Sequence, residues 1–162
     1  MGSGKSVIGK SFAKEINYKF VDTDKLIEKK TGKTISHIFS KLGEDHFRDI
    51  EFQEISKLLG KKNYVISLGG GTILNNNLRN IIKKNSFNVY LKVNIDTLTK
   101  RLEKSKNRPL IQNKDIKEVL SNLMKKREKY YEKADLIIYN QYKISDTIKE
   151  LKTYFKINEK NY

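Results

Sequence analysis

The run Gly2-Ser3-Gly4-Lys5-Ser6 constrains this chain more than any other feature, because it matches the second half of a nucleotide phosphate loop. A complete loop reads Gly, four residues, and then Gly-Lys-Ser or Gly-Lys-Thr, and it joins a buried strand to the N-terminus of a helix. The first Gly of the motif and its strand would precede Met1. The same letters also fit an N-myristoylation signal, in which Met-Gly is followed by Ser at the sixth position. The rest of the chain has to separate the two interpretations.

The composition restricts the class of protein. A length of 162 residues predicts one domain with one core, spanning 1–162. The chain has no cysteine, which excludes disulfides, thiolate metal ligands and a cysteine nucleophile. It also contains no apolar run long enough to span a bilayer and no recognisable leader, so we expect a soluble, cytoplasmic protein with no membrane partner.

The formal net charge of +15 raises the alternative of a basic nucleic-acid-binding module. The 34 basic residues comprise 29 Lys and 5 Arg, and the lysines are scattered along every predicted helix. No base-stacking or helix-turn-helix pattern accompanies them. We therefore expect no nucleic-acid partner and assign most of the charge to solvated surfaces.

The few arginines are more informative than the many lysines. Where only a charge is needed this chain uses Lys, so an Arg suggests a place where the planar, two-pronged guanidinium matters. We expect most of the arginines to contact a carboxylate or a phosphate. They are Arg48, Arg79, Arg101, Arg108 and Arg127.

Strands and helices alternate along the predicted structure. Short apolar runs predict strands at 19–22, 64–68, 87–93 and 136–139. Helical spacing of apolar residues predicts helices from the phosphate loop to about 17, then before Gly32, from 34 to 59 with a break at Gly43, around 78–82, and at 95–102, 116–131 and 144–155. The polar stretch at about 103–115 is typical of a mobile lid. This alternation predicts an α/β fold, with a parallel sheet covered by helices on both faces.

In such folds ligands bind at the carboxyl ends of the strands, where the motifs of this chain fall. Asp22 and Asp24 follow one strand and could provide a base and a metal-holding carboxylate for phosphoryl transfer. Alternatively, Asp22 or Thr23 only caps the next helix. The triple glycine 69–71 follows another strand and predicts close approach of the backbone to a ligand, since one Gly suffices for an ordinary turn.

Three arginines have both a functional and a simpler interpretation. Arg48 and Glu51 are three residues apart and could form only a weak surface pair on a helix. Arg127 could be one more solvated charge, and Arg108 only a loop residue before Pro109. The preference for Lys elsewhere in the chain favours the functional interpretation of all three.

Together these pieces resemble the shikimate kinase family from Met1 to about Tyr139. Each piece is weak alone, and their shared order and spacing make the match specific. In order they are Gly2-Ser3-Gly4-Lys5-Ser6, Phe20-Val21-Asp22-Thr23-Asp24, Ile27-Glu28, Gly32, Ile35, Ile38-Phe39, Gly43-Glu44, Phe47-Arg48, Glu51, Gly69-Gly70-Gly71, Arg108-Pro109-Leu110 and Arg127 with Tyr130.

The resemblance implies a three-layer P-loop kinase fold with strand order 2-3-1-4-5. Strand 1 of that order lies directly ahead of the phosphate loop, so we expect the printed chain to lack it. Its absence would leave a gap in the middle of the sheet and unpaired backbone groups on the neighbouring strands. On this ground a catalytically inactive relative is one alternative.

The resemblance also implies the reaction, transfer of the γ-phosphoryl of ATP to the 3-hydroxyl of shikimate, with Mg²⁺. Separately, we expect a monomer. The implied nucleotide contacts are Gly2, Ser3, Gly4, Lys5, Ser6, Val7, Arg101 on adenine, and Arg108 from the lid. The implied metal residues are Ser6 and Asp22. The implied shikimate contacts are Asp24 as base, Arg48 and Arg127 on the carboxylate, Gly69, Gly70 and Gly71, and the pocket-lining Phe39 and Phe47. Asp24, Lys5 and Arg108 would be the catalytic residues.

Another small-metabolite kinase, similar to gluconate kinases, is the nearest alternative function. Such enzymes share the phosphate loop and the lid, but not the set formed by Arg48, the triple glycine 69–71 and Arg127. The resemblance from Met1 to about Tyr139 also disfavours the N-myristoylation signal.

Overall fold

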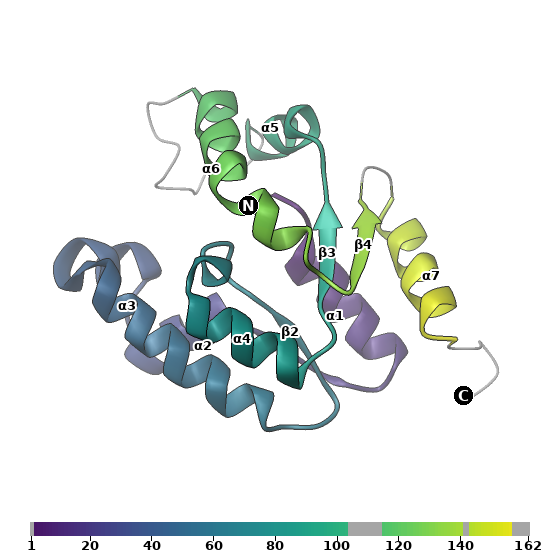
Figure 1. Cartoon of the computed structure of the whole chain (residues 1–162), viewed down its shortest axis with the longest axis horizontal. Helices are drawn as coiled ribbons and strands as arrows, with labels where there is room; N and C mark the ends of the chain where they lie inside the picture. Colours follow the sequence, from purple (N-terminus) through teal and green to yellow (C-terminus); the bar gives the residue numbers. More distant parts are fainter. Residues whose placement is uncertain (1, 104–114, 141–142, 157–162) are drawn as a thin grey trace.

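The structure is a computed structural model that describes residues 2–103, 115–140 and 143–156 (Figure 1). It confirms the predicted alternation of strands and helices. The short helix η1 was not predicted, because three residues are too few to show a helical period. The elements are α1 (Lys5–Glu15), β1 (Lys19–Asp22), α2 (Thr23–Thr31), α3 (Ile35–Leu59), β2 (Tyr64–Ser67), η1 (Thr72–Leu74), α4 (Asn76–Asn85), β3 (Val89–Lys92), α5 (Ile95–Glu103), α6 (Ile116–Tyr131), β4 (Leu136–Tyr139) and α7 (Ile144–Tyr154).

The ends of the helices follow their cap residues. Gly32 ends α2 with a left-handed φ of 66°, as its position predicted. Thr34 caps α3 by accepting a hydrogen bond from the backbone N–H of His37 at 3.2 Å. Gly43 interrupts α3 with φ 86° and ψ 166°, a conformation open essentially only to Gly. The predicted break is therefore confirmed.

The strands form two parallel pairs, β1 with β2 and β3 with β4. β3 is shorter than the predicted 87–93, because its partner β4 offers only four residues for pairing. Phe87 lies outside the strand and packs against the rings of Tyr154 and Phe155, with centroids 5.5 and 5.1 Å away. Tertiary packing thus sets the ends of β3, and the apolar pattern overestimated its length.

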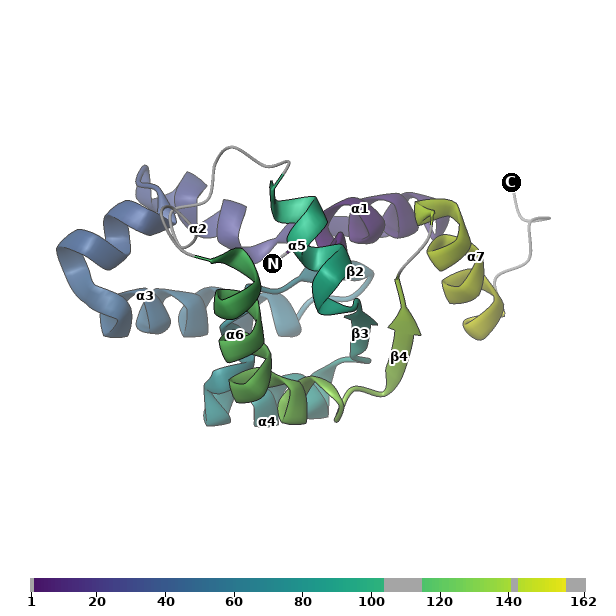
Figure 2. The same ribbon diagram turned by 90° about the horizontal axis from the view of Figure 1, so that it is seen from above.

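Helices cover the strands on two sides, which confirms the three-layer arrangement. Figure 2 shows α1 on one side of β2 and β3 and α4 on the other. Four separate clusters of buried apolar residues hold the layers together. They are Ile8, Phe12, Ile138 and Leu151; Val93, Leu98, Leu102 and Leu120; Ile27, Ile38 and Phe47; and Ile55, Leu78 and Ile82.

A cavity of about 1330 Å³ lies between the two strand pairs. Apolar residues of β2, β3, α1 and α7 line it, including Val65, Leu91, Phe12 and Leu151. No described strand joins β2 to β3, so one edge of each has no partner strand among the described residues. This arrangement agrees with the expected order 2-3-1-4-5, in which β1 and β2 stand for strands 2 and 3, and β3 and β4 for strands 4 and 5.

The segment predicted as a lid falls almost entirely outside the described residues. Glu103 ends α5, and Asp115 caps α6 by accepting hydrogen bonds from the N–H groups of Lys117 and Glu118. Arg108 lies between them and is not described. None of the helices that the structure describes combines the length and apolar composition needed to cross a bilayer.

Candidate active site

The phosphate loop leads directly into α1, as the motif predicted. Gly2 and Gly4 have left-handed φ values of 70° and 82°, which a side chain would disfavour. The N-cap Gly4 provides no side-chain hydrogen bond, and the first turn of α1 contains no acidic residue. The first N–H groups of α1 and its positive dipole end therefore stay available for an anion.

Asn140 and Arg101, which lie far along the chain, form hydrogen bonds with the backbone of this loop. The buried side chain of Asn140 donates a hydrogen bond to the carbonyl of Ser3 at 2.6 Å and accepts one from the Thr147 hydroxyl at 3.1 Å. Arg101 donates to the carbonyls of Gly2 and Asn140 at 3.2 and 3.3 Å. Arg101 was expected at the nucleotide, and the structure places its guanidinium against the phosphate loop.

Ser6 and Asp22 lie together at the start of α1 and the end of β1. The hydroxyl of Ser6 donates a hydrogen bond of 2.5 Å to Oδ2 of Asp22. Oδ1 of Asp22 accepts from the backbone N–H of Lys25 at 3.3 Å, so Asp22 also caps α2. The capping alternative is therefore confirmed for one oxygen of this carboxylate, while the other oxygen contacts Ser6 of the phosphate loop.

Asp24 occupies the first turn of α2, next to the glycine turn. Burial raises the pKa of Asp24, and the nearby carboxylates of Asp22 and Glu51 raise it further, while the ammonium of Lys5 opposes this change. A Cβ on Gly69 would lie 2.7 Å from Oδ1 of Asp24. The carboxylate of Asp24 thus lies close to Lys5 on one side and to Gly69 on the other, and it takes up a proton more readily than an ordinary aspartate.

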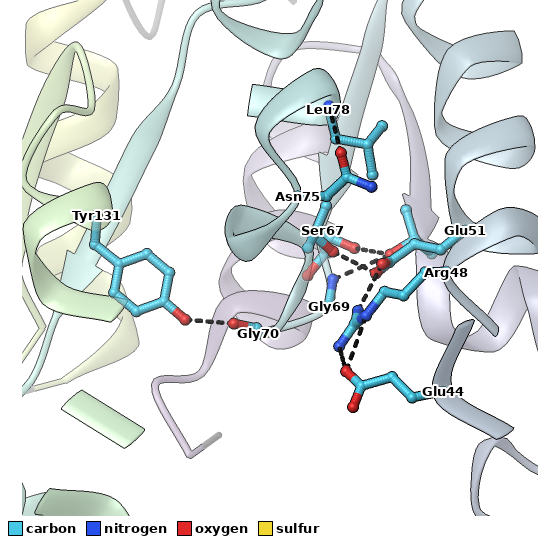
Figure 3. Close-up of polar contacts among 11 residues, drawn as sticks. Glu44, Arg48, Glu51, Ser67, Gly69, Gly70, Asn75, Leu78 and Tyr131 are labelled. Carbon is cyan, nitrogen blue, oxygen red and sulfur yellow. Dashed lines mark hydrogen bonds and ion pairs between the residues drawn. The ribbon is translucent and has the colours of Figure 1, made fainter. Parts of the chain in front are cut away.

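Arg48 is held between two carboxylates (Figure 3). Its Nη1 lies 2.6 Å from Oε2 of Glu51, and its Nη2 lies 2.8 Å from Oε1 of Glu44. The side chain of Glu51 is only 1% exposed, whereas that of Glu44 is 60% exposed. The other oxygen of Glu51 accepts a hydrogen bond of 2.5 Å from the Thr72 hydroxyl. The interpretation of Arg48 and Glu51 as a surface pair is therefore wrong, because Glu51 is buried.

Two residues of the triple glycine, Gly69 and Gly71, lie against these side chains. A Cβ on Gly69 would lie 3.1 Å from Oε1 of Glu51, and a Cβ on Gly71 would collide with the guanidinium of Arg48. The N–H of Gly69 donates to the Thr23 hydroxyl at 3.1 Å. The turn therefore packs directly against Asp24 and Arg48, and larger residues at positions 69 and 71 would displace these two side chains.

Phe39 and Phe47 lie together on one side of the guanidinium of Arg48, with their ring centroids 5.9 and 5.2 Å from its Cζ. The two rings lie 4.8 Å apart. Phe47 is buried in the cluster with Ile27 and Ile38, and Phe39 is half-buried beside it. These rings fix the position of the guanidinium, which is attracted to their faces.

Arg127 projects from α6 with its Nε buried and without a hydrogen-bond partner among the described residues. One helical turn later, the hydroxyl of Tyr131 donates a hydrogen bond of 2.6 Å to the carbonyl of Gly70. Arg79 differs from the expectation for arginines, because it binds the backbone carbonyls of Ile73 and Leu74 and lies 4.2 Å from the ring centroid of Tyr130.

The structure thus brings most of the predicted residues to one site, where α1, α2, the second half of α3 and the glycine turn meet. Val7 is 54% exposed and follows the loop. Sequence reasoning missed Thr23, Thr72 and Asn140, which are buried polar residues that tie the turns together. Only Thr23 carried a signal, its position between two aspartates at a strand end.

The described residues contain no group of three or more His, Asp or Glu side chains that could hold a metal by themselves. The hydroxyl of Ser6 and the carboxylate of Asp22 are oxygen ligands of the kind that Mg²⁺ prefers. Mg²⁺ usually keeps several waters and binds through one or two carboxylates together with substrate phosphates. This pair therefore fits a phosphate-bound Mg²⁺ better than an isolated metal site.

Comparisons with known proteins agree with this geometry. A family model for shikimate kinase matches residues 1–155. The shikimate kinase of Thermodesulfovibrio yellowstonii is 43% identical over 138 residues, which cover 85% of this chain and 80% of that protein. The shikimate kinase of Chlorobium limicola is 40% identical over 159 residues, which cover 93% and 80%.

Solved structures show the same similarity in three dimensions. A shikimate kinase from Bacteroides thetaiotaomicron matches with a TM-score of 0.91 at 29% identity, covering 97% of this chain and 94% of that one. A shikimate kinase from Acinetobacter baumannii in complex with shikimate matches with a TM-score of 0.89 at 34% identity, covering 99% and 91%. On this evidence the chain belongs to the shikimate kinase family.

Proposed function

We propose that this site binds ATP and shikimate side by side and transfers the γ-phosphoryl of ATP to the 3-hydroxyl of shikimate. The observation that carries the proposal is the contact of the glycine turn with two groups at once. Gly69 lies against Asp24, and Gly71 lies against Arg48. An alcohol activated at Asp24 and a carboxylate held at Arg48 would thus belong to one small molecule.

Asp24 is the proposed base. Its carboxylate would accept the proton of the 3-hydroxyl as the oxygen attacks phosphorus and the bond from phosphorus to the β-phosphate oxygen breaks. Its raised pKa makes the carboxylate a stronger base for the proton of the 3-hydroxyl. Lys5 would pair with the phosphate oxygens, and its charge also acts to lower the pKa of Asp24, against the effect of burial.

Arg48 and Arg127 are the proposed clamp for the shikimate carboxylate, with Gly69, Gly70 and Gly71 against the ring and Phe39 and Phe47 lining the pocket. Arg48 already pairs with the exposed Glu44, so the substrate carboxylate would replace Glu44 while the buried Glu51 stays in place. The buried Nε of Arg127 has no hydrogen-bond partner among the described residues, and a ligand carboxylate would satisfy it.

On the nucleotide side, Gly2 to Val7 would bind the phosphates through backbone N–H groups at the N-terminus of α1. Ser6 and Asp22 would hold Mg²⁺, with Asp22 acting through a water. When bound, Mg²⁺ neutralises charge on the transferring phosphates. Arg101 is proposed at adenine and Arg108 at the phosphates, and Arg108 lies outside the described residues.

We further propose that the chain works as a single domain, 1–162, with a lid at about 103–115, as a cytoplasmic monomer without nucleic-acid or membrane partners. A lid that closes over both ligands would exclude water, which otherwise competes as phosphoryl acceptor.

The proposal is tested by ADP release with ATP, Mg²⁺ and candidate acceptors. Shikimate should support turnover, whereas gluconate should give only the rate measured without acceptor. Removal of the metal with a chelator should abolish turnover, and added Mg²⁺ should restore it. Equal turnover with gluconate would favour the alternative kinase, and turnover that does not depend on shikimate would reject the proposal.

A further inference from the structure

A tyrosine of α6 contacts the glycine turn from the side opposite Arg48. The hydroxyl of Tyr131 donates a hydrogen bond of 2.6 Å to the carbonyl of Gly70, a residue 61 positions earlier in the chain. Figure 3 shows Tyr131 reaching Gly70 from one side of the turn, while Arg48 and Glu51 lie on the other. The turn is therefore held from both sides.

The ring of Tyr131 is itself fixed. It stacks on the ring of Tyr90 in β3, with centroids 5.1 Å apart and planes inclined by 26°. Burial raises the pKa of the Tyr131 hydroxyl, and the nearby guanidinium of Arg127 only partly offsets this effect. The hydroxyl thus stays protonated at neutral pH and remains a hydrogen-bond donor to Gly70.

Arg127 lies one helical turn before Tyr131, so the two side chains project from the same face of α6. The guanidinium of Arg127 is close enough to affect the titration of the Tyr131 hydroxyl. The Nε of Arg127 is buried and has no partner in the described part of the chain. Among the described residues, the hydrogen bond from Tyr131 to Gly70 links the turn to the helix that carries Arg127.

We propose that Tyr131 is a positioning residue for shikimate, holding the Gly70 backbone and the Arg127 guanidinium in one rigid frame. This inference rests on the proposed function, in which both groups touch the substrate. The hydroxyl does not take part in phosphoryl transfer. The Tyr131 hydrogen bond fixes the distance between the Gly70 backbone and the Arg127 guanidinium, which come from different elements. The accuracy with which substrate contacts are placed strongly affects binding.

The neighbouring Tyr130 provides a matched control on the same helix. Its ring lies against the guanidinium of Arg79, with 4.2 Å between the ring centroid and Cζ. Tyr130→Phe removes a hydroxyl but keeps a ring in that contact. Tyr131→Phe also removes only a hydroxyl, and it breaks the hydrogen bond to Gly70.

The test compares wild type, Tyr131→Phe, Tyr130→Phe, Arg127→Lys and the double variant Tyr131→Phe/Arg127→Lys. KM for shikimate and for ATP is measured in each, with Tm as a check on folding. Tyr131→Phe should raise KM for shikimate about fivefold, the usual effect of one neutral hydrogen bond, and should leave KM for ATP within about twofold. Tyr130→Phe should leave both values at the wild-type level. The double variant should lose less than the product of the two single effects.

An unchanged KM for shikimate in Tyr131→Phe, with Arg127→Lys raising it, overturns the inference and leaves the proposed function standing. A rise of both KM values together also overturns it, because that result indicates general loosening of the fold. If neither Tyr131→Phe nor Arg127→Lys changes KM for shikimate, the proposed carboxylate clamp at Arg127 fails and the inference fails with it. Multiplicative effects in the double variant would show that Tyr131 and Arg127 act independently, against the proposal.

Discussion

The guanidinium of Arg48 is anchored by Glu51, whose carboxylate is buried and lies 2.6 Å from Nη1. The same carboxylate accepts a hydrogen bond from Thr72, just beyond the glycine turn. Glu51 therefore links α3 to that turn, and the position of Arg48 depends on both.

Glu51→Gln should destabilise the fold and weaken shikimate binding together. Removing one charge of a buried pair costs about 3 kcal/mol, because the other charge stays desolvated. The matched control is Glu44→Gln, which affects the same arginine at an exposed position and should cost less than about 1 kcal/mol. Urea unfolding measures both variants. Equal stabilities would show that Glu51 does not anchor Arg48.

Arg48→Lys and Arg101→Lys should have opposite effects on the two substrates. Arg48→Lys loses a two-pronged contact with a carboxylate and should raise KM for shikimate about 10- to 100-fold, with little change in KM for ATP. Arg101→Lys removes hydrogen bonds to the carbonyls of Gly2 and Asn140, which weakens the support of the phosphate loop, and should raise KM for ATP instead. Steady-state kinetics with each substrate varied checks the pair. A rise in the same KM for both variants would contradict the separation of the two subsites.

Asp24→Asn should lower kcat by at least about 100-fold and leave ATP affinity nearly unchanged, because the proposed base is lost. Loss of ATP affinity would instead assign Asp24 to the metal. In the wild type, kcat should fall as the pH drops through the pKa of Asp24, which burial raises above 3.8.

The same shift predicts the effect of Asp24 on stability. A carboxyl pKa that is higher in the folded than in the unfolded state contributes stability below 3.8, and this contribution is lost as pH rises through the folded value. The ionised Asp24 therefore lowers stability at neutral pH, and Asp24→Asn should raise Tm there. At a pH below the unfolded value the difference in Tm should vanish. A lower Tm for Asp24→Asn at pH 7 would contradict this interpretation.

An apolar strand inserted between β2 and β3 should stabilise the fold. Five buried apolar residues would contribute about 10 kcal/mol, against about 7 kcal/mol for ordering them, before the hydrogen bonds to both strand edges. A fusion of five Val and Ile residues and a short Gly linker ahead of Gly2 should therefore raise Tm by about 5 °C or more. A Gly/Ser segment of equal length is the control. Equal Tm values for the two fusions would show that the cavity does not accept a strand.

Much of the fold could be predicted from the sequence, because its signals are local. Gly32, Thr34 and Gly43 mark helix ends through their own backbone preferences and caps, and the structure confirms each. The phosphate loop, the two aspartates and the triple glycine were likewise recognised as contiguous motifs, and the family they indicated is confirmed. The strand ends near Phe87 were less predictable, because pairing with β4 and ring packing against α7 decide them.

The sequence by itself determined the elements and the residue types of the site, since these depend on neighbours within a few positions. It determined the family through the order and spacing of its motifs along the chain. Only the tertiary structure decided that Glu51 is buried, that Asn140 holds Ser3, and that Tyr131 reaches Gly70. These contacts join residues from 21 to 137 positions apart, and no local pattern encodes such a distance. The gap between the strand pairs was expected from the strand order of the family, but only the tertiary structure decided which side chains line it, because these come from β2, β3, α1 and α7.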